Sequence, residues 1–172
     1  MEARTVAGLE LGTNTYNLKL AKIKAQAYYV FYNDKIPEMI GKNSSSQGVI
    51  TQQAQQRAEK ALKKYRKLIH QEGIDKIYGF ATSAFRDAAN GTKIRAILEK
   101  KTGLSIHIIS GSTEARYIYS GVSSALDIGE KPALIVDIGG GSVELIIANN
   151  RQIFWLNIFE LGAQRLYDLF HK

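Results

Sequence analysis

The chain has 172 residues, which is enough for one domain, or for one domain and the start of a second. It contains no cysteine, so disulfides, a cysteine nucleophile and thiolate metal sites are excluded, and this usage fits a cytoplasmic protein. No apolar run is long enough to cross a membrane, and no signal-peptide pattern stands at the N-terminus. The net charge of +7 favours an acidic partner (nucleic acid, anionic lipid or a polyphosphorylated substrate), although a solvated Lys/Arg surface gives the same charge.

Strands and helices alternate along the chain, which indicates an α/β fold. Apolar runs predict strands over 5–11, 16–23, 27–32, 76–81, 104–109 and 151–158, and on either side of the sequence GGGS within 134–148. Helices are expected over 52–71, at the start of 82–91, over 92–102, and after residues 112 and 161. A polar loop is expected over 35–48.

The long helix is predicted to be capped by Thr51 and ended by Gly73. One of its faces is apolar. Largely off that face lie five basic residues, Lys60, Lys63, Lys64, Arg66 and Lys67. They fit either a basic binding face or a solvated face, and the sequence leaves both open.

The segment TSAFRDAANG at 82–91 is predicted to open a short helix capped by Thr82 or Ser83. Free N–H groups at the start of a helix form a natural anion site. Arg86 lies one turn in and can fork onto phosphate oxygens. A surface pair between Arg86 and Asp87 explains the same residues equally well.

The turn at 110–112 leads into a helix that carries Glu114. An acid near a helix start usually stabilises the helix dipole or belongs to a capping box, and it can also be a general base. Residues 125–131 resemble a linker, with Pro132 after them, so we place a domain boundary between 125 and 126.

The stretch LIVDIGGGSVELIIA at 134–148 has a near copy at 6–21, VAGLELGTNTYNLKLA. Without a gap, Glu10 falls on Asp137, Gly12 on Gly139 and Thr15 on Ser142. In both stretches an apolar strand ends in an acid, turns on glycine and returns as a second strand. The copy predicts that one β-turn-β unit is used twice.

Such a bend exposes backbone N–H groups, and glycine lets an anion approach them closely. The acid beside the bend would repel phosphate directly, so we expect it to hold Mg²⁺ or water. Two bends facing each other would clamp a phosphate chain from both sides. Two ordinary hairpins whose glycines only satisfy turn geometry are the alternative. No GxxxxGK(S/T) motif occurs, and a strand follows the glycines, so the bend is neither a P-loop nor a dinucleotide fingerprint.

Five motifs, in this order, resemble the exopolyphosphatase/guanosine-pentaphosphate phosphohydrolase (Ppx/GppA) family: ELGTNT, ATSAFRDAANG, ISGSTEA, VDIGGGSVEL and LGAQRL. The resemblance implies the actin/Hsp70/sugar-kinase superfold, with two ribonuclease-H-like lobes and a cleft between them. The expected fold is α/β, with a first lobe over 1–125 built on a mixed five-stranded sheet flanked by helices. Residues 126–172 are expected to form the opening strands and helix of the second lobe.

The resemblance also implies residue roles. Glu114 matches the catalytic base that activates the attacking water, and Arg86 matches the arginine that contacts substrate phosphate. Asp137 and Glu144, together with Glu10 of the first loop, match acids that hold Mg²⁺ or orient water. The residues that match phosphate-binding loops are Thr13, Asn14, Gly139, Gly140, Gly141 and Ser142.

Three departures from the family pattern stand out. Glu10 replaces the usual aspartate and adds a methylene, which would shift the position of a metal bound there, and the sequence leaves open whether Glu10 keeps metal binding. Ser112 and Thr113 replace acids that commonly precede the catalytic glutamate, so less negative charge stands nearby. Family members are considerably longer than this chain, so half of the cleft wall is expected to be missing.

The sequence thus predicts a cytoplasmic, Mg²⁺-dependent enzyme that releases terminal phosphate from inorganic polyphosphate, or the 5′ phosphate of guanosine pentaphosphate. No membrane and no specific nucleic acid is expected as a partner. The alternative is a polyphosphate- or nucleotide-binding lobe that acts as a sensor or needs a partner chain. A sugar kinase or actin-like ATPase is disfavoured by ISGSTEA and ATSAFRDAANG. The apolar end at 166–170 indicates an exposed face that takes a partner, and a homodimer is one option.

Overall fold

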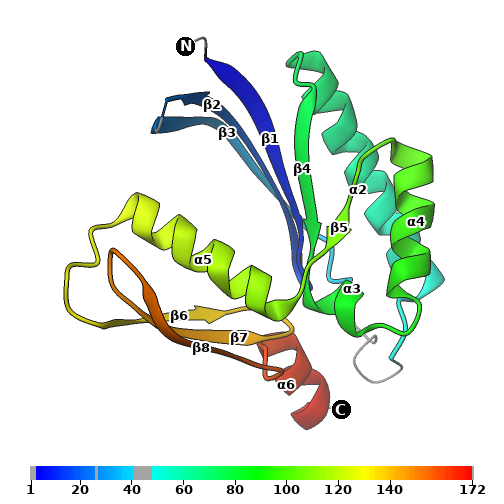
Figure 1. Cartoon of the computed structure of the whole chain (residues 1–172). Coiled ribbons are helices and arrows are strands. Elements are labelled where there is room, and N and C mark those ends of the chain that lie inside the picture. Colours follow the sequence, from blue (N-terminus) through cyan, green and yellow to red (C-terminus); the bar gives the residue numbers. More distant parts are fainter. Residues whose placement is uncertain (1–2, 26, 41–47, 172) are drawn as a thin grey trace. The chain divides into compact units, whose positions relative to one another are not determined.

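The computed structural model describes residues 3–25, 27–40 and 48–171. The chain divides into two compact units, Met1–Ile108 and Ile109–Lys172, which Figure 1 colours from blue to green and from yellow-green to red. This division differs from the sequence-based boundary at 125/126. It falls earlier because helix α5 (Gly111–Ala125) packs on strands of the second unit.

Unit 1 contains a mixed sheet of five strands in the order β3-β2-β1-β4-β5. β1 pairs antiparallel with β2, and β2 with β3, whereas β1–β4 and β4–β5 are parallel. Helices α2 and α4 lie side by side against the sheet (Figure 1). The elements are β1 (Arg4–Leu11), β2 (Thr15–Lys24), β3 (Ala27–Pro37), α2 (Gln52–Gln71), β4 (Lys76–Ala81), α3 (Ser83–Asp87), α4 (Gly91–Thr102) and β5 (His107–Ile108). The predicted five-stranded mixed sheet flanked by helices is confirmed.

The core of unit 1 follows the sequence periodicities. Alternate residues of β1 and β2 are buried, among them Leu9 and Leu18, and α2 buries the apolar stripe that includes Leu62. The Thr51 side chain caps α2 by accepting the N–H group of Ala54 at 3.2 Å, as predicted. Gly73 follows α2 with a φ of +64°, which glycine adopts most readily.

Two predicted elements of unit 1 differ in length. β3 runs to Pro37 because it pairs with β2 along its whole length, so the polar loop begins later than predicted, and its part at 41–47 lies outside the described residues. The strand predicted over 104–109 is reduced to two residues. The Glu99 side chain of α4 accepts the N–H group of Ile106 (2.8 Å), and Arg95 donates to the carbonyl of Ile106 (3.4 Å), which takes up groups that a longer strand would use.

Unit 2 is a three-stranded antiparallel sheet with α5 along one face (Figure 1). A small core forms where α5 contributes Ala115 and the sheet contributes Ile146 and Ala148. The opposite face stays open, and large apolar side chains such as Leu134 and Trp155 are 61% and 44% exposed there. The elements are α5 (Gly111–Ala125), β6 (Ala133–Ile138), β7 (Val143–Ala148), β8 (Ile153–Phe159) and α6 (Ala163–Phe170). Over the described ranges, no helix combines the length and the apolarity that crossing a membrane would require.

Candidate functional site

The two hairpins that the sequence relates to each other, β1–β2 in unit 1 and β6–β7 in unit 2, have the same turn. The N–H group of Gly12 donates to the carbonyl of Thr15 (3.0 Å), and that of Gly139 donates to the carbonyl of Ser142 (2.9 Å). A Cβ on Gly12 would lie 2.9 Å from the Thr15 carbonyl oxygen, and one on Gly139 would lie 3.1 Å from that of Ser142. The backbone contact therefore excludes a Cβ at Gly12 unless the turn shifts, and it leaves little room for one at Gly139.

The two residues that follow each of these glycines are Thr13 and Asn14 in the first turn, and Gly140 and Gly141 in the second. No hydrogen bond joins their four N–H groups to any residue in the part of the chain that the structure describes. The carbonyl of Asn14 accepts the N–H group of Glu38 (3.0 Å), which holds the first turn against the end of β3. Each turn thus offers two adjacent backbone donors, an arrangement that suits an anion.

The second turn is held in shape by the start of α6. The carbonyls of Gly139 and Gly140 accept the N–H groups of Ala163 and Gln164, both at 2.9 Å. A Cβ on Gly162 would overlap backbone atoms of the turn, so this residue must also be glycine. The LGAQRL motif therefore supports the turn, and its N–H groups are used by the turn's carbonyls.

The acid before each turn has a partner on the neighbouring strand. Glu10 is register partner of Asn17, whose side-chain amide donates to the Glu10 carboxylate at 2.9 Å. Asp137 is register partner of Glu144, which is 1% exposed, whereas Asp137 is exposed. The ungapped alignment places Asn17 on Glu144, so this signal for Asn17 was present in the sequence, although sequence reasoning passed over it.

Three residues form one row across the sheet of unit 2: Asp137, Glu144 and Ile158. Directly opposite residues of antiparallel strands point to the same face. That face is the one that α5 covers, because a Cβ on Gly111 would touch the Ile158 side chain at 3.2 Å. The start of α5, which carries Glu114, therefore lies on the same face as both acids.

The cap of α5 decides between two of the readings of Glu114. Ser110 caps the helix by accepting the N–H group of Thr113 at 3.2 Å. The acid of a capping box belongs at the position of Thr113, so Glu114 is not that acid. Glu114 remains in the first turn, where its charge is favourable to the helix dipole, and it is half-buried.

In unit 1, β1 and β4 end side by side, since Leu11 and Ala81 are register partners and the Thr82 N–H group donates to the Leu11 carbonyl (3.3 Å). Thr82 occupies the cap position of α3, but its side chain makes no cap bond there. Arg86, 19% exposed, has its Nε 3.8 Å from Oδ1 of Asp87. The ion pair between Arg86 and Asp87, which the sequence offered as the alternative to phosphate binding by Arg86, is therefore present.

No group of three or more His, Cys, Asp and Glu side chains that could hold a metal ion occurs within 3–25, 27–40 and 48–171. Mg²⁺ does not need such a group, because it commonly keeps several waters and binds one or two carboxylates plus substrate phosphates. The exposed Asp137 next to Glu144 fits that smaller requirement. The predicted facing of the two turns concerns the placement of unit 1 relative to unit 2 and stays a prediction.

Comparison with known proteins adds the family to this geometry. A family model described as the Ppx/GppA phosphatase family matches residues 20–172. The chain belongs to the Ppx/GppA phosphatase family. The resemblance seen in the five motifs is thereby confirmed.

Relatives of known structure and curated relatives agree with this membership. An exopolyphosphatase from Cytophaga hutchinsonii is 34% identical, with a TM-score of 0.94 over 98% of this chain and 54% of that one. A bifunctional 3-dehydroquinate synthase/phosphatase from Fusobacterium nucleatum is 31% identical over 95% of this chain and 26% of that protein. The chain thus spans about half the length of the solved relative and about a quarter of the curated one.

A more distant likeness bears on the fold alone. MreB5 of Spiroplasma citri is 19% identical, with a TM-score of 0.50 over 96% of this chain. The Ppx/GppA chain therefore has the actin-like, ribonuclease-H-like fold that its motifs led us to expect.

Proposed function

We propose that this chain supplies the catalytic turns of a Mg²⁺-dependent phosphohydrolase, which releases terminal phosphate from inorganic polyphosphate or the 5′ phosphate of guanosine pentaphosphate. The observation that carries the proposal is the turn after Asp137. There the adjacent N–H groups of Gly140 and Gly141 bond to no described residue, and the carboxylates of Asp137 and Glu144 lie nearby on one face of the sheet. Membership of the Ppx/GppA family and the likeness to an exopolyphosphatase support it.

In unit 2, we assign Glu114 as the general base that takes a proton from the attacking water. The water oxygen bonds to the terminal phosphorus, the bridging P–O bond breaks, and the shortened phosphate chain leaves with the electron pair. The N–H groups of Gly140 and Gly141 bind phosphoryl oxygens on which negative charge develops. Ser142, buried beside them, keeps the turn closed through its carbonyl.

The acids of the same row would hold Mg²⁺, which supplies positive charge against the phosphate oxygens when it is bound. Asp137 is open to solvent and is suited to a hydrated cation, while the buried Glu144 is suited to orienting a ligand or a water.

In unit 1, we assign phosphate contacts to the N–H groups of Thr13 and Asn14, and to Arg86, whose guanidinium exchanges Asp87 for phosphate oxygens. Glu10, oriented by the Asn17 amide, is assigned to Mg²⁺ or its water. The absence of cysteine fits a cytoplasmic location.

Phosphate release from polyphosphate and from guanosine pentaphosphate, measured side by side with and without Mg²⁺, tests this proposal. Glu114→Gln is expected to lower the rate about 10²–10⁴-fold with the unfolding midpoint unchanged. Glu130→Gln, which changes an exposed acid of the same unit, is the control. An unchanged rate in Glu114→Gln would exclude Glu114 as base. Tight polyphosphate binding without any release would instead favour the binding-lobe alternative.

A further inference from the structure

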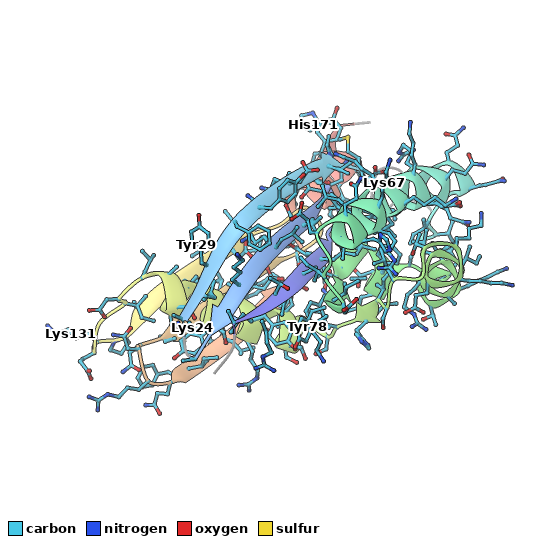
Figure 2. All side chains as sticks on the ribbon, turned by 90° about the horizontal axis from the view of Figure 1, so that it is seen from above. Lys24, Tyr29, Lys67, Tyr78, Lys131 and His171 are labelled. Carbon is cyan, nitrogen blue, oxygen red and sulfur yellow. The ribbon has the colours of Figure 1, made fainter. Side chains whose placement is uncertain are left out.

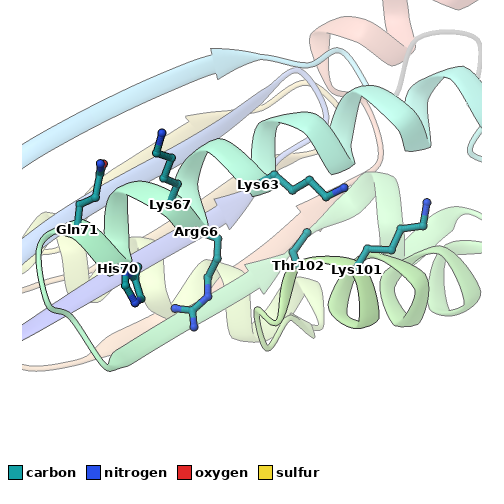
Figure 3. A pocket seen from close by; sticks show the side chains of 7 residues that line it. All are labelled: Lys63, Arg66, Lys67, His70, Gln71, Lys101 and Thr102. Atoms are coloured by element: carbon teal, nitrogen blue, oxygen red, sulfur yellow. The ribbon is translucent and has the colours of Figure 1, made fainter.

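A hollow of about 480 Å³ in unit 1 is lined by residues of α2 and α4, and most of them are basic. Figure 3 shows Arg66 and His70 pointing to one side of α2 and Lys67 and Gln71 to the other, with Lys101 reaching up from α4. The lining residues are Lys63, Arg66, Lys67, His70, Gln71, Lys101 and Thr102. Along α2, the four cationic or titratable positions 63, 66, 67 and 70 span about 10 Å at 1.5 Å per residue.

The two helices hold the whole positive surplus of the chain. α2 carries six Lys and Arg residues against one Glu, and α4 carries four against one. Their joint surplus of eight exceeds the net charge of +7 for all 172 residues. Nitrogen-tipped side chains accordingly stand out over α2 and α4 in Figure 2. A field of this kind raises the local concentration of anions.

The helix dipole explains only part of this charge. Cations are favoured in the last turn of a helix, which accounts for Lys101 in α4. Lys63, Arg66 and Lys67 lie before the last turn of α2, where the effect has fallen off. Their placement needs another reason.

Ion pairing within the protein neutralises some of these cations and leaves others available. Glu59 accepts from Lys63 and from Lys101, both at 2.6 Å, and so ties α2 to α4 at the rim of the hollow. Arg66 and Lys67, in contrast, make no ion pair with another residue among 3–25, 27–40 and 48–171. Two cations in the hollow therefore have no internal counter-ion in the described structure.

We propose that this hollow binds condensed phosphate, as a segment of linear inorganic polyphosphate held away from the first turn. The choice of ligand rests on the proposed function. A phosphate chain fits better than nucleic acid, since single strands bind through stacking on aromatic rings and the lining offers no ring other than that of His70. Arg66 can fork onto phosphate oxygens while Lys63, Lys67 and Lys101 act as point charges.

The hollow is separate from the first turn. α2 ends beside it and leads into β4 at Lys76, whereas the turn lies at the other end of β4, where Ala81 meets Leu11. A strand of this length extends about 17 Å. A long polyphosphate chain can reach both places, and a three-phosphate chain cannot. The hollow is therefore expected to favour long chains through their second attachment.

Binding of a fluorescently labelled long polyphosphate, followed by anisotropy without Mg²⁺ at several salt concentrations, tests the inference. The double variant Arg66→Gln/Lys67→Gln keeps helix propensity and removes two charges. We expect about tenfold weaker binding. The slope of log affinity against log salt should become shallower by about 1.4, about 0.7 per lost contact. The control Lys24→Gln/Lys93→Gln removes two exposed charges that do not line the hollow and should leave binding within twofold.

A variant that is expected to tighten polyphosphate binding distinguishes a binding role from an effect on folding. Glu59→Gln releases Lys63 and Lys101 and is expected to tighten binding several-fold while weakening the α2–α4 contact. Equal effects of the two double variants, or no tightening in Glu59→Gln, would overturn the inference. So would an oligouridylate of equal charge binding as tightly as polyphosphate, because the hollow would then be a general nucleic-acid surface.

The two proposals can fail separately because binding is measured without turnover. Loss of polyphosphate binding in Arg66→Gln/Lys67→Gln supports the hollow even if no phosphate is ever released. Suppose instead that phosphate is released, and that the double variant hydrolyses long and three-phosphate chains with the same ratio of rates as the parent protein. That result would exclude the hollow as a binding site and leave the proposed phosphohydrolase activity intact.

Discussion

Asp137 and Glu144 are register partners across β6 and β7, and their side chains leave the sheet on the same face, one exposed and the other 1% exposed. Two carboxylates so placed differ in what they can do. The exposed one can meet a hydrated cation at little cost, whereas the buried one keeps its charge only with a partner.

This pair leads to a prediction for Mg²⁺ dependence. Asp137→Asn is expected to raise the Mg²⁺ concentration needed for half-maximal phosphate release by about tenfold or more, since second-sphere and ligand changes at metal sites commonly have that size. Because Asp137 is exposed, the free energy of unfolding should change by less than about 0.5 kcal/mol. Asp75→Asn, at an exposed site in unit 1, is the control. An unchanged Mg²⁺ requirement would remove Asp137 from the metal site.

Gly162 allows a test of how the second turn is supported. Gly162→Ala would push a methyl group into backbone atoms of Gly140 and Gly141, which cannot move without opening the turn. We expect a loss of about 1–3 kcal/mol in the free energy of unfolding, as for other overpacked sites. Gly121→Ala, within α5 and with open space at its Cβ, should instead stabilise by up to about 1 kcal/mol. Urea unfolding measures both, and equal shifts would contradict the packing argument.

Glu38 gives a prediction for pH dependence. Burial raises the pKa of Glu38, and the guanidinium of Arg57, with Nε at 3.9 Å, opposes this only in part. A carboxyl whose folded pKa is raised costs stability above that pKa, and the cost disappears as the pH falls toward its unfolded value. Glu38→Gln should therefore raise the urea midpoint at pH 7, with a smaller gain at pH 4.5.

Glu59 serves as the comparison, because its pKa is shifted in the opposite direction to that of Glu38. Hydrogen bonds from Lys101 and Lys63 lower the pKa of Glu59, so its contribution to stability is present at neutral pH and is lost as the pH falls through the folded pKa. Glu59→Gln should lower the urea midpoint at pH 7 and have less effect in acid. If both variants shift the midpoint in the same direction, the burial argument for Glu38 fails.

Asn90, within the motif that carries Arg86, is predicted to be structural. Its side-chain amide donates to the Ile50 carbonyl (2.9 Å) and its oxygen accepts the Ile50 N–H group (2.8 Å), which ties the corner before α4 to the entry of α2. Asn90→Ala leaves both groups of Ile50 without these partners and should cost about 1–3 kcal/mol. Asn90→Asp keeps the acceptor and should cost less. Calorimetry measures the stability of both variants. If the rate of phosphate release per folded molecule also falls, Asn90 belongs to the catalytic site and its role is not only structural.

Much of the fold could be predicted because local signals and the final packing agree. The apolar alternation of β1 and the stripe of α2 are the surfaces that the core buries, and Thr51 caps the helix that it precedes. The internal copy predicted that two hairpins would share one turn, and Gly12 and Gly139 indeed make equivalent hydrogen bonds. An ungapped repeat is informative because the same backbone needs the same residues.

What the sequence could not supply comes from contacts between distant segments. The strand predicted over 104–109 is shortened because a side chain of α4 binds its backbone. The apolar periodicity of 104–109 does not indicate that Glu99 accepts the N–H group of Ile106. The role of Gly162 depends on the turn twenty residues before it. The pairing of Asn17 with Glu10 could be predicted through the repeat, because Asn17 aligns with Glu144 of the second unit.

The dependence of the second turn on α6 has a consequence for the order of folding. Gly139, Gly140 and Gly141 leave the ribosome before residues 162–165, whose N–H groups hold their carbonyls. The β6–β7 hairpin can form while that later segment is still being synthesised, but its turn lacks the brace until then. Nascent chains stalled before and after α6 emerges should therefore differ in protease sensitivity at the glycines.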